Sequence, residues 1–222
     1  MSQIPNFSNV IVTKPWGFEY LAYENKDVGL WLLRIEQGES TSMHCHPKKN
    51  TGLVLLEGKA EISFLNDKVI LEAPSKMMLR RGLFHSTRAI SDEGLYMLEV
   101  ECPPIKEDLV RLKDNYGRKN KPYEGKERRT YRNEDCLLLT DNDINKGEFN
   151  FHGRSLNLIT VNQNSILAKV TEDQILMCLT GGLISENKDL IYRPGDVING
   201  KLYKQLLKDF TIIDDSLILL IS

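Results

Sequence analysis

Three of the four histidines in this chain have types and spacing that suit a metal ion. His44 and His46 are separated by one residue, and His85 follows further along the chain. Along a β-strand, residues i and i+2 point to the same face, so the first pair can direct two imidazoles at one point. A third imidazole from a neighbouring strand completes a facial set of nitrogen ligands for a divalent metal. The sequence therefore predicts a metal site at these three residues. The alternative is a barrel without an ion, in which they hydrogen-bond substrate or water.

The segments around the histidines are short apolar runs separated by turn residues. Their even spacing, with glycine or Asn66-Asp67 at the breaks, favours an antiparallel barrel or jelly roll over a parallel sheet. Asn66-Asp67 itself predicts a hairpin turn, because both residues tolerate left-handed backbone. The runs expected to form strands are 28–35, 52–56, 60–65, 68–71, 76–79 and 95–100.

The residues around the first two histidines resemble the first motif of the cupin superfamily. That motif reads glycine, five residues, His-x-His, then a glutamate and a later glycine. Gly38, His44, His46 and Gly58 fall in register with it. Thr51 stands where the glutamate ligand is expected, so the resemblance implies a metal held by three neutral imidazoles, with the ion keeping its full charge.

A second cupin motif, Pro-x-Gly followed by two residues and His, is matched by Gly82 and His85, with Arg80 in place of the proline. The run 14–17, Lys-Pro-Trp-Gly, resembles the segment that enters the barrel in mannose-6-phosphate isomerase-like (type II) cupins. The match covers roughly residues 10–102. It implies an all-β fold, the cupin double-stranded β-helix or jelly-roll barrel. Zn²⁺, Mn²⁺, Fe²⁺ and Ni²⁺ all suit such a site.

The carboxy-terminal part repeats the strand rhythm of the first. Residues 174–183 are similar in pattern to 51–60, with Gly181 over Gly58, and 189–196 resembles the strand and Pro-Gly turn between the cupin motifs. Because no histidine follows His152, we expect a degenerate cupin-like unit without metal ligands, a possible bicupin. The alternative is an unrelated β segment packed on the first barrel.

The periodicity over 106–118 predicts one connecting helix, with Leu109, Leu112 and Tyr116 on one stripe. The charged stretch that follows is typical of a connector. The expected organisation is a metal-binding barrel over 1–105, the helix and connector over 106–135, and the degenerate β unit over 136–222.

Charged residues near the motifs suggest roles beside the metal. Glu99 alternates with apolar residues on its strand, so it either faces the interior and acts as a general base or lies outside as an ordinary charge. Lys49, Arg80 and Arg88 are candidates to hold a phosphate or carboxylate, with Thr51 beside them, or are solvated loop residues.

Two other residue types have structural interpretations. Cys45 lies between two expected ligands and must point the other way, as a small buried hydrophobe. Trp16 and Trp31 are interpreted as core residues, with stacking on a sugar as the alternative.

Composition narrows the classes of function. A net charge of −2 and a pI near 6.1 give no field that attracts nucleic acid or a membrane surface. No apolar run is long enough for a transmembrane helix, the start of the chain lacks the pattern of a signal peptide, and the four cysteines show no paired spacing. We therefore expect a cytoplasmic protein with reduced thiols, a small-molecule sugar or sugar phosphate as partner, and a homodimer.

Three functions are compatible with these residues. The resemblance implies a metal-dependent isomerase or epimerase acting on a phosphorylated or nucleotide-linked sugar, in surface-polysaccharide biosynthesis, with Glu99 as base. Three histidines without a carboxylate also resemble the Fe²⁺ dioxygenases of the cupin superfamily. The third possibility is a sugar-binding module without catalysis.

Overall fold

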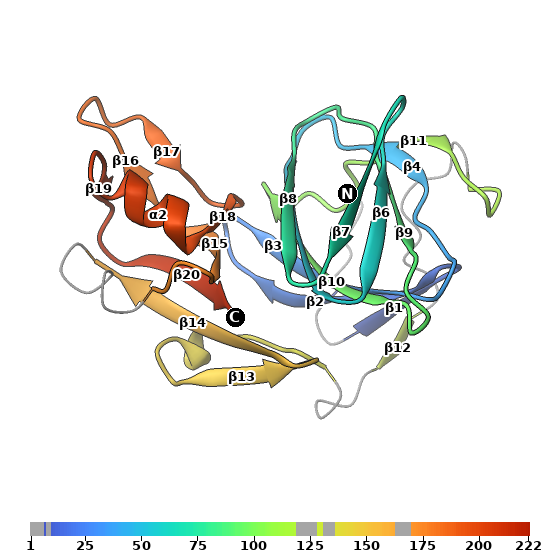
Figure 1. The fold of residues 1–222 in the computed structure, drawn as a ribbon, viewed down its shortest axis with the longest axis horizontal. Helices are drawn as coiled ribbons and strands as arrows, with labels where there is room; N and C mark the ends of the chain where they lie inside the picture. The colour runs from blue at the N-terminus through green and yellow to red at the C-terminus, as the bar shows by residue number, and fades with distance from the viewer. Residues whose placement is uncertain (1–6, 8–9, 119–127, 131–135, 163–169) are drawn as a thin grey trace, which may run out of the picture.

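The computed structural model describes residues 7, 10–118, 128–130, 136–162 and 170–222. Two β units follow one another along the chain, and Figure 1 shows the amino-terminal unit at the right and the carboxy-terminal unit at the left. All six runs expected to form strands overlap strands of the first unit. The hairpin at Asn66-Asp67 is also confirmed, because the Phe64 amide donates to the Asp67 carbonyl at 2.7 Å across the turn.

The first unit is built on a large antiparallel sheet with the order β12-β1-β2-β3-β10-β5-β8. Its strands are β1 (Val10–Lys14), β2 (Gly17–Glu24), β3 (Gly29–Ile35), β5 (Asn50–Glu57), β8 (Ser75–Leu79), β10 (Leu95–Cys102) and β12 (Arg128–Thr130).

A second layer faces this sheet and closes the barrel. It consists of a three-stranded sheet, β7-β6-β9, and a two-stranded pair, β11-β4. Apolar side chains from the inner faces of both layers fill the space between them. The all-β barrel that the sequence predicts is therefore present. The strands of this layer are β4 (Met43–Cys45), β6 (Lys59–Ser63), β7 (Lys68–Glu72), β9 (Ser86–Ala89) and β11 (Val110–Lys113).

The second unit repeats the strand pairing of the first. Its sheets have the orders β13-β14-β20-β15-β18 and β17-β16-β19, which match β2-β3-β10-β5-β8 and β7-β6-β9 strand for strand. Gly58 and Gly181, at the two equivalent strand junctions, both have positive φ (86° and 69°). The strands are β13 (Glu148–Phe151), β14 (Arg154–Val161), β15 (Ile175–Thr180), β16 (Leu183–Ile184), β17 (Leu190–Tyr192), β18 (Val197–Asn199), β19 (Thr211–Ile212) and β20 (Ser216–Ile221).

The helix expected over 106–118 is wrong. That segment contains strand β11, which pairs with β4 through Val110↔Cys45 and Arg111↔His44. Pairing with β4 supplies the backbone hydrogen bonds that a helix would make internally. Of the three residues of the predicted stripe, Leu112 is 37% exposed. Among the described residues the α-helix is α2 (Gly200–Leu206), and η2 (Asp141–Asp143) is a single 3₁₀ turn.

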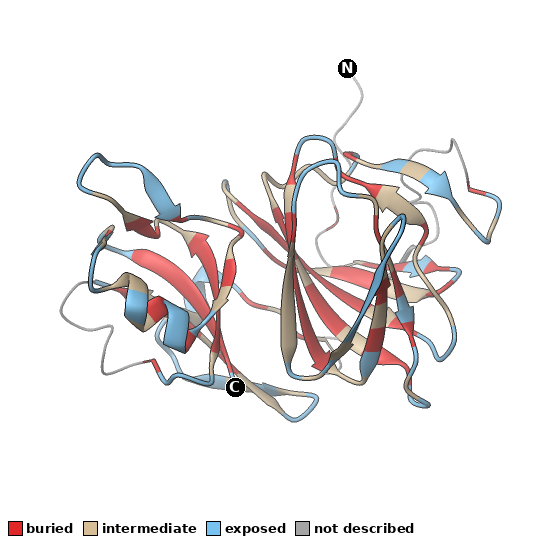
Figure 2. Cartoon of the chain, turned by 45° about the horizontal axis from the view of Figure 1, so that its top comes forward, coloured by how far each residue is buried: buried red, intermediate tan, exposed pale blue. Residues whose placement is uncertain are grey.

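The two units share a hydrophobic core. Residues on β10 alternate, so Leu95 and Met97 face the inside of the first barrel, while Leu98 and Val100 face the second unit. There they join a cluster with residues of the five-stranded sheet, such as Leu219. Figure 2 shows buried residues along the facing strands of both units. The outer face of the large sheet is thus covered within the chain.

No described helix has the length and apolar character needed to cross a membrane.

Candidate metal centre

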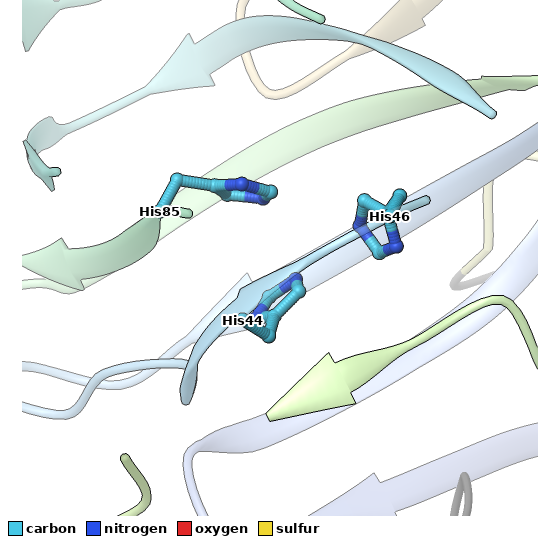
Figure 3. A group of neighbouring side chains, drawn as sticks. All are labelled: His44, His46 and His85. Atoms are coloured by element: carbon cyan, nitrogen blue, oxygen red, sulfur yellow. The ribbon is translucent and has the colours of Figure 1, made fainter. Parts of the chain in front are cut away.

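The three histidines are brought together by one pair of antiparallel segments. His44 lies on β4, His46 follows that strand directly, and His85 precedes β9. His44 and His85 exchange two backbone hydrogen bonds of 2.9 and 2.8 Å, which fixes the register of the two segments. One potential ligand nitrogen from each of the three rings lies within 4.8 Å of the others, and Figure 3 shows the rings gathered in one place. The structure therefore brings the three histidines together, as their spacing in the sequence predicts.

Each of the three imidazoles is oriented by a hydrogen bond between its Nδ1 and a backbone carbonyl oxygen. Nδ1 of His44 lies 2.7 Å from the Ser42 carbonyl oxygen, and Nδ1 of His85 lies 3.0 Å from that of Leu83. Nδ1 of His46 lies 2.7 Å from the Asp108 carbonyl oxygen. A carbonyl accepts only, so each Nδ1 carries the proton and donates it, which leaves the Nε2 lone pair for another partner. Metal-binding histidines are oriented by such hydrogen bonds.

The chemistry of this donor set fits a metal. Nε2 of His46 is buried and has no hydrogen-bond partner among the described residues, an arrangement that costs free energy unless something binds there. Burial lowers the pKa of His85 to about 4, and it also lowers those of His44 and His46, helped by the neighbouring rings and by Lys49. The three rings are therefore neutral at pH 7, which is the form that coordinates a metal.

Glu99 faces the interior of the barrel, beside the histidines. Its Oε1 lies 3.9 Å from Nε2 of His46, and its side chain is 12% exposed. Burial and then the charge of Glu101 raise the pKa of Glu99 to about 7, against the opposing effects of Lys106 and Lys49. Of the two orientations open from the sequence, the structure has the interior one. A carboxyl with this pKa can both accept and return a proton near neutral pH.

A network of buried ion pairs forms the floor of the pocket. Lys49 Nζ lies 2.6 Å from Glu101 Oε1, and Lys106 Nζ lies 3.5 Å from the same oxygen and 3.3 Å from Glu19 Oε1. Lys14 Nζ in turn lies 3.5 Å from Glu19 Oε1. Although burial lowers it, these carboxylates hold the pKa of Lys106 above its usual value. The network therefore keeps fixed charges next to Glu99.

The pocket that contains His44 and His46 has an empty volume of about 470 Å³ and an excess of cations. Five basic and three acidic side chains line it, so the lining favours an anionic ligand. Arg118 is fixed by Asp114, whose Oδ1 accepts from Nε at 2.9 Å and from a terminal nitrogen at 2.6 Å. The basic residues are Lys14, Lys49, Lys106, Arg111 and Arg118, and the acidic residues are Glu19, Glu99 and Glu101.

The candidate substrate residues divide into two groups. Lys49 lines the pocket, and Thr51, on the inward face of β5, is fully buried with a hydroxyl that has no hydrogen-bond partner among the described residues. Arg80 and Arg88 do not reach the pocket. Arg88 lies between the buried Thr87 and Ala89 and therefore points outward, where its Nε donates to the Gly38 carbonyl at 3.1 Å. Arg80 lines a separate surface depression.

Sequence reasoning missed most of the cations in the pocket. The sequence offered no reason to place Lys106, Arg111 and Arg118 in the pocket, because their segment was expected to form a connecting helix. In the structure this segment contains β11, which pairs with β4 beside the histidines. Glu19 could have been found by alternation, because it is a buried acid on a strand whose neighbours Phe18 and Tyr20 point the other way.

The interpretations of Cys45, Trp16 and Trp31 as buried residues agree with the structure. Cys45 is buried, with 6% of its surface exposed, and burial raises the pKa of its thiol, which favours the unreactive protonated form. Trp16 and Trp31 are both buried in the barrel core. Trp16 also lines the pocket, and Lys106 Nζ lies 3.6 Å from the centre of a Trp31 ring.

Comparisons with known proteins give distant matches. No protein-family model matches the chain. The Xanthan biosynthesis protein XanB of Xanthomonas campestris pv. campestris (strain B100) is 24% identical over 113 residues, which is 48% of this chain and 23% of that protein. The chain therefore matches less than a quarter of the length of this curated relative.

Solved structures with similar folds are also distant in sequence. The capsular polysaccharide assembling protein CapF from Staphylococcus aureus has a TM-score of 0.43 and 15% identity, covering 47% of this chain and 34% of that chain. A double-stranded β-helix protein from Klebsiella pneumoniae subsp. pneumoniae MGH 78578 has a TM-score of 0.40 and 16% identity, covering 50% and 90%. A cupin-2 domain protein from Shewanella frigidimarina NCIMB 400 has a TM-score of 0.35 and 20% identity, covering 38% and 78%.

Proposed function

We propose that the chain is a metal-dependent enzyme that moves a proton on an anionic sugar, as an isomerase or epimerase of a phosphorylated or nucleotide-linked substrate. The single observation that supports this most is the position of Glu99, with a pKa near 7 and 3.9 Å from His46, at the edge of a three-imidazole cluster. An acid–base group therefore lies in the same pocket as His44 and His46, two of the three candidate metal ligands.

Each part of the pocket has a role in this proposal. His44, His46 and His85 would hold a divalent ion, which when bound polarises a substrate carbonyl oxygen and makes the neighbouring C–H more acidic. Glu99 takes that proton at Oε1 and returns it to the adjacent carbon or to the opposite face. Arg111, fixed on β11 at the wall of the pocket, attracts the phosphate group of the substrate.

The proposed pathway is polysaccharide biosynthesis. The support is the named role of the Xanthomonas relative, together with a cationic pocket that suits sugar phosphates and sugar nucleotides. The proposed metal is Zn²⁺, Mn²⁺, Fe²⁺ or Ni²⁺, since three imidazoles suit each of them.

Solvent deuterium exchange tests the proposed reaction. Proton transfer beside a carbonyl incorporates deuterium from D₂O into the sugar, which proton NMR detects on a panel of hexose phosphates and nucleotide sugars. Glu99→Gln should lower the exchange by about 10²–10⁴-fold while leaving the metal content of the protein unchanged. Tight binding of a sugar without exchange in the parent protein would make the chain a binding module. Oxygen uptake with bound iron would make it a dioxygenase instead.

A further inference from the structure

A second cationic site lies on the surface where the two units meet, apart from the histidine pocket. Arg80 and Arg81 come from the loop after β8 in the first unit, and Arg193 comes from the turn between β17 and β18 in the second. All three line one open depression, and none of its lining residues is acidic. The full lining is Asn50, Arg80, Arg81, Gly82, Leu83 and Arg193.

The charges in this depression are poorly compensated. The side chains of Arg80 and Arg81 are exposed, and their guanidinium groups make no hydrogen bond or ion pair with any described residue. Nε of Arg193 lies 3.6 Å from Asp196 Oδ2, an oxygen that also accepts from the Arg193 amide at 3.1 Å. Three guanidinium groups around one depression repel one another, and an anion between them would remove that repulsion. Guanidinium forks match the oxygens of a phosphate group, which they bind in a bidentate manner.

The backbone on both sides of the depression is fixed by contacts, between the units on one side and within the first unit on the other. Gly195, with φ of +90°, lies against Cys102 of the first unit so closely that a Cβ there would collide with it. The amide of Val197 donates to Met78 Sδ at 3.3 Å, across the same interface. On the other side, the Gly82 amide donates to the His46 carbonyl at 2.9 Å. The three arginines are therefore held on one rigid frame.

We propose that this depression is a binding site for a phosphate or pyrophosphate group, and that the second unit contributes Arg193 to it. The second unit, in which the sequence predicts no metal ligands, would thus contribute to ligand binding. The loop after β8, which carries Arg80 and Arg81, also orients His85 of the candidate metal centre, because the Leu83 carbonyl accepts from Nδ1 of His85. The anion site stands on its own geometry and does not depend on the reaction proposed above.

Calorimetric titration with inorganic pyrophosphate tests the site. The parent protein should bind pyrophosphate, and Arg81→Ala and Arg193→Ala should each weaken the binding by about tenfold or more. Arg193→Lys, which keeps the charge but loses the fork, should weaken it less. The matched control is Arg88→Ala, because Arg88 is also exposed but lies outside the depression, and it should leave the affinity unchanged.

A His44→Ala/His46→Ala variant separates the depression from the histidine pocket. Binding that persists in this variant and disappears in Arg193→Ala supports the proposed site. Binding that is lost in the histidine variant and kept in Arg193→Ala overturns it, as does the absence of any binding by the parent. Tighter binding of a nucleoside diphosphate than of pyrophosphate would identify a nucleotide as the source of the anion, and equal binding would identify the free anion.

Discussion

At the scale of single residues, the site depends on where each imidazole proton lies. Three backbone carbonyls fix the protons on Nδ1, and burial keeps the rings neutral. The sequence predicted from their spacing that these three rings would lie together, because strand alternation is a local property. It could not predict which carbonyl groups accept from the three Nδ1 atoms, because every residue has a backbone carbonyl, whatever its type.

The lowered pKa values predict that the metal-free protein loses stability in acid. A histidine with a folded pKa below its unfolded value of 6.5 binds fewer protons when folded, so the free energy of unfolding falls as the pH falls below 6.5. For His85 this loss runs down to about pH 4. Each such group contributes a slope of about 1.4 kcal/mol per pH unit. Glu99, whose folded pKa is raised to about 7, acts with the opposite sign between pH 7 and its unfolded value of 4.5.

Urea denaturation of chelator-treated protein between pH 7 and pH 4.5 measures this slope. Three histidines outweigh one glutamate, so the parent should be less stable at the acid end. His85→Gln removes one titrating ring and should make the slope shallower by up to about 1.4 kcal/mol per pH unit. Equal slopes in parent and variant would show that His85 does not titrate as its burial implies.

At the scale of elements, the strands could be predicted and the segment after them could not. The six apolar runs are short and stand between turn residues, and each overlaps a strand. The segment 106–118 has an apolar stripe at helical spacing, yet its backbone pairs with β4, because tertiary pairing overrides a weak local preference. Since that segment supplies Lys106, Arg111 and Arg118 to the pocket, most of the cationic wall was missed with it.

Asp108 connects the segment 106–118 to the histidines. Its carbonyl accepts from Nδ1 of His46, and its carboxylate accepts from the amides of Lys48 and Lys49 at 2.7 and 3.0 Å. Loss of the carboxylate should release the loop and the carbonyl, so Asp108→Ala should lower metal affinity by about 10–100-fold. Competition with a chromophoric chelator measures the affinity. Glu107→Ala, an exposed neighbour, is the matched control, and an equal effect of both variants would contradict the role of Asp108.

At the scale of the whole molecule, the two units form one packed body. The sequence predicted the repeat from Gly181 and the strand rhythm, and the strand order of the second unit matches that of the first. It could not predict that the outer face of the large sheet is buried against the second unit. An apolar residue on a strand looks the same whether it faces its own barrel or a neighbouring one.

The shared core predicts that the units unfold together. Both tryptophans lie in the first unit, so their fluorescence reports on that unit, whereas far-ultraviolet circular dichroism reports on both. Leu219→Ala, in the second unit, removes a fully buried side chain from the shared core and should destabilise the protein by about 2–5 kcal/mol. The two signals should shift by the same amount. A tryptophan transition that stays in place would show that the units unfold independently.

Metal content tests the central claim most directly. Elemental mass spectrometry on protein purified without a histidine tag, beside a His44→Ala/His46→Ala variant, counts the ions that each chain holds. We predict about one divalent ion per chain in the parent and almost none in the variant, because a structural or catalytic site of this type needs all three imidazoles. No metal in the parent after incubation with Zn²⁺, Mn²⁺, Fe²⁺ and Ni²⁺ in turn, or equal metal in parent and variant, would contradict the metal centre.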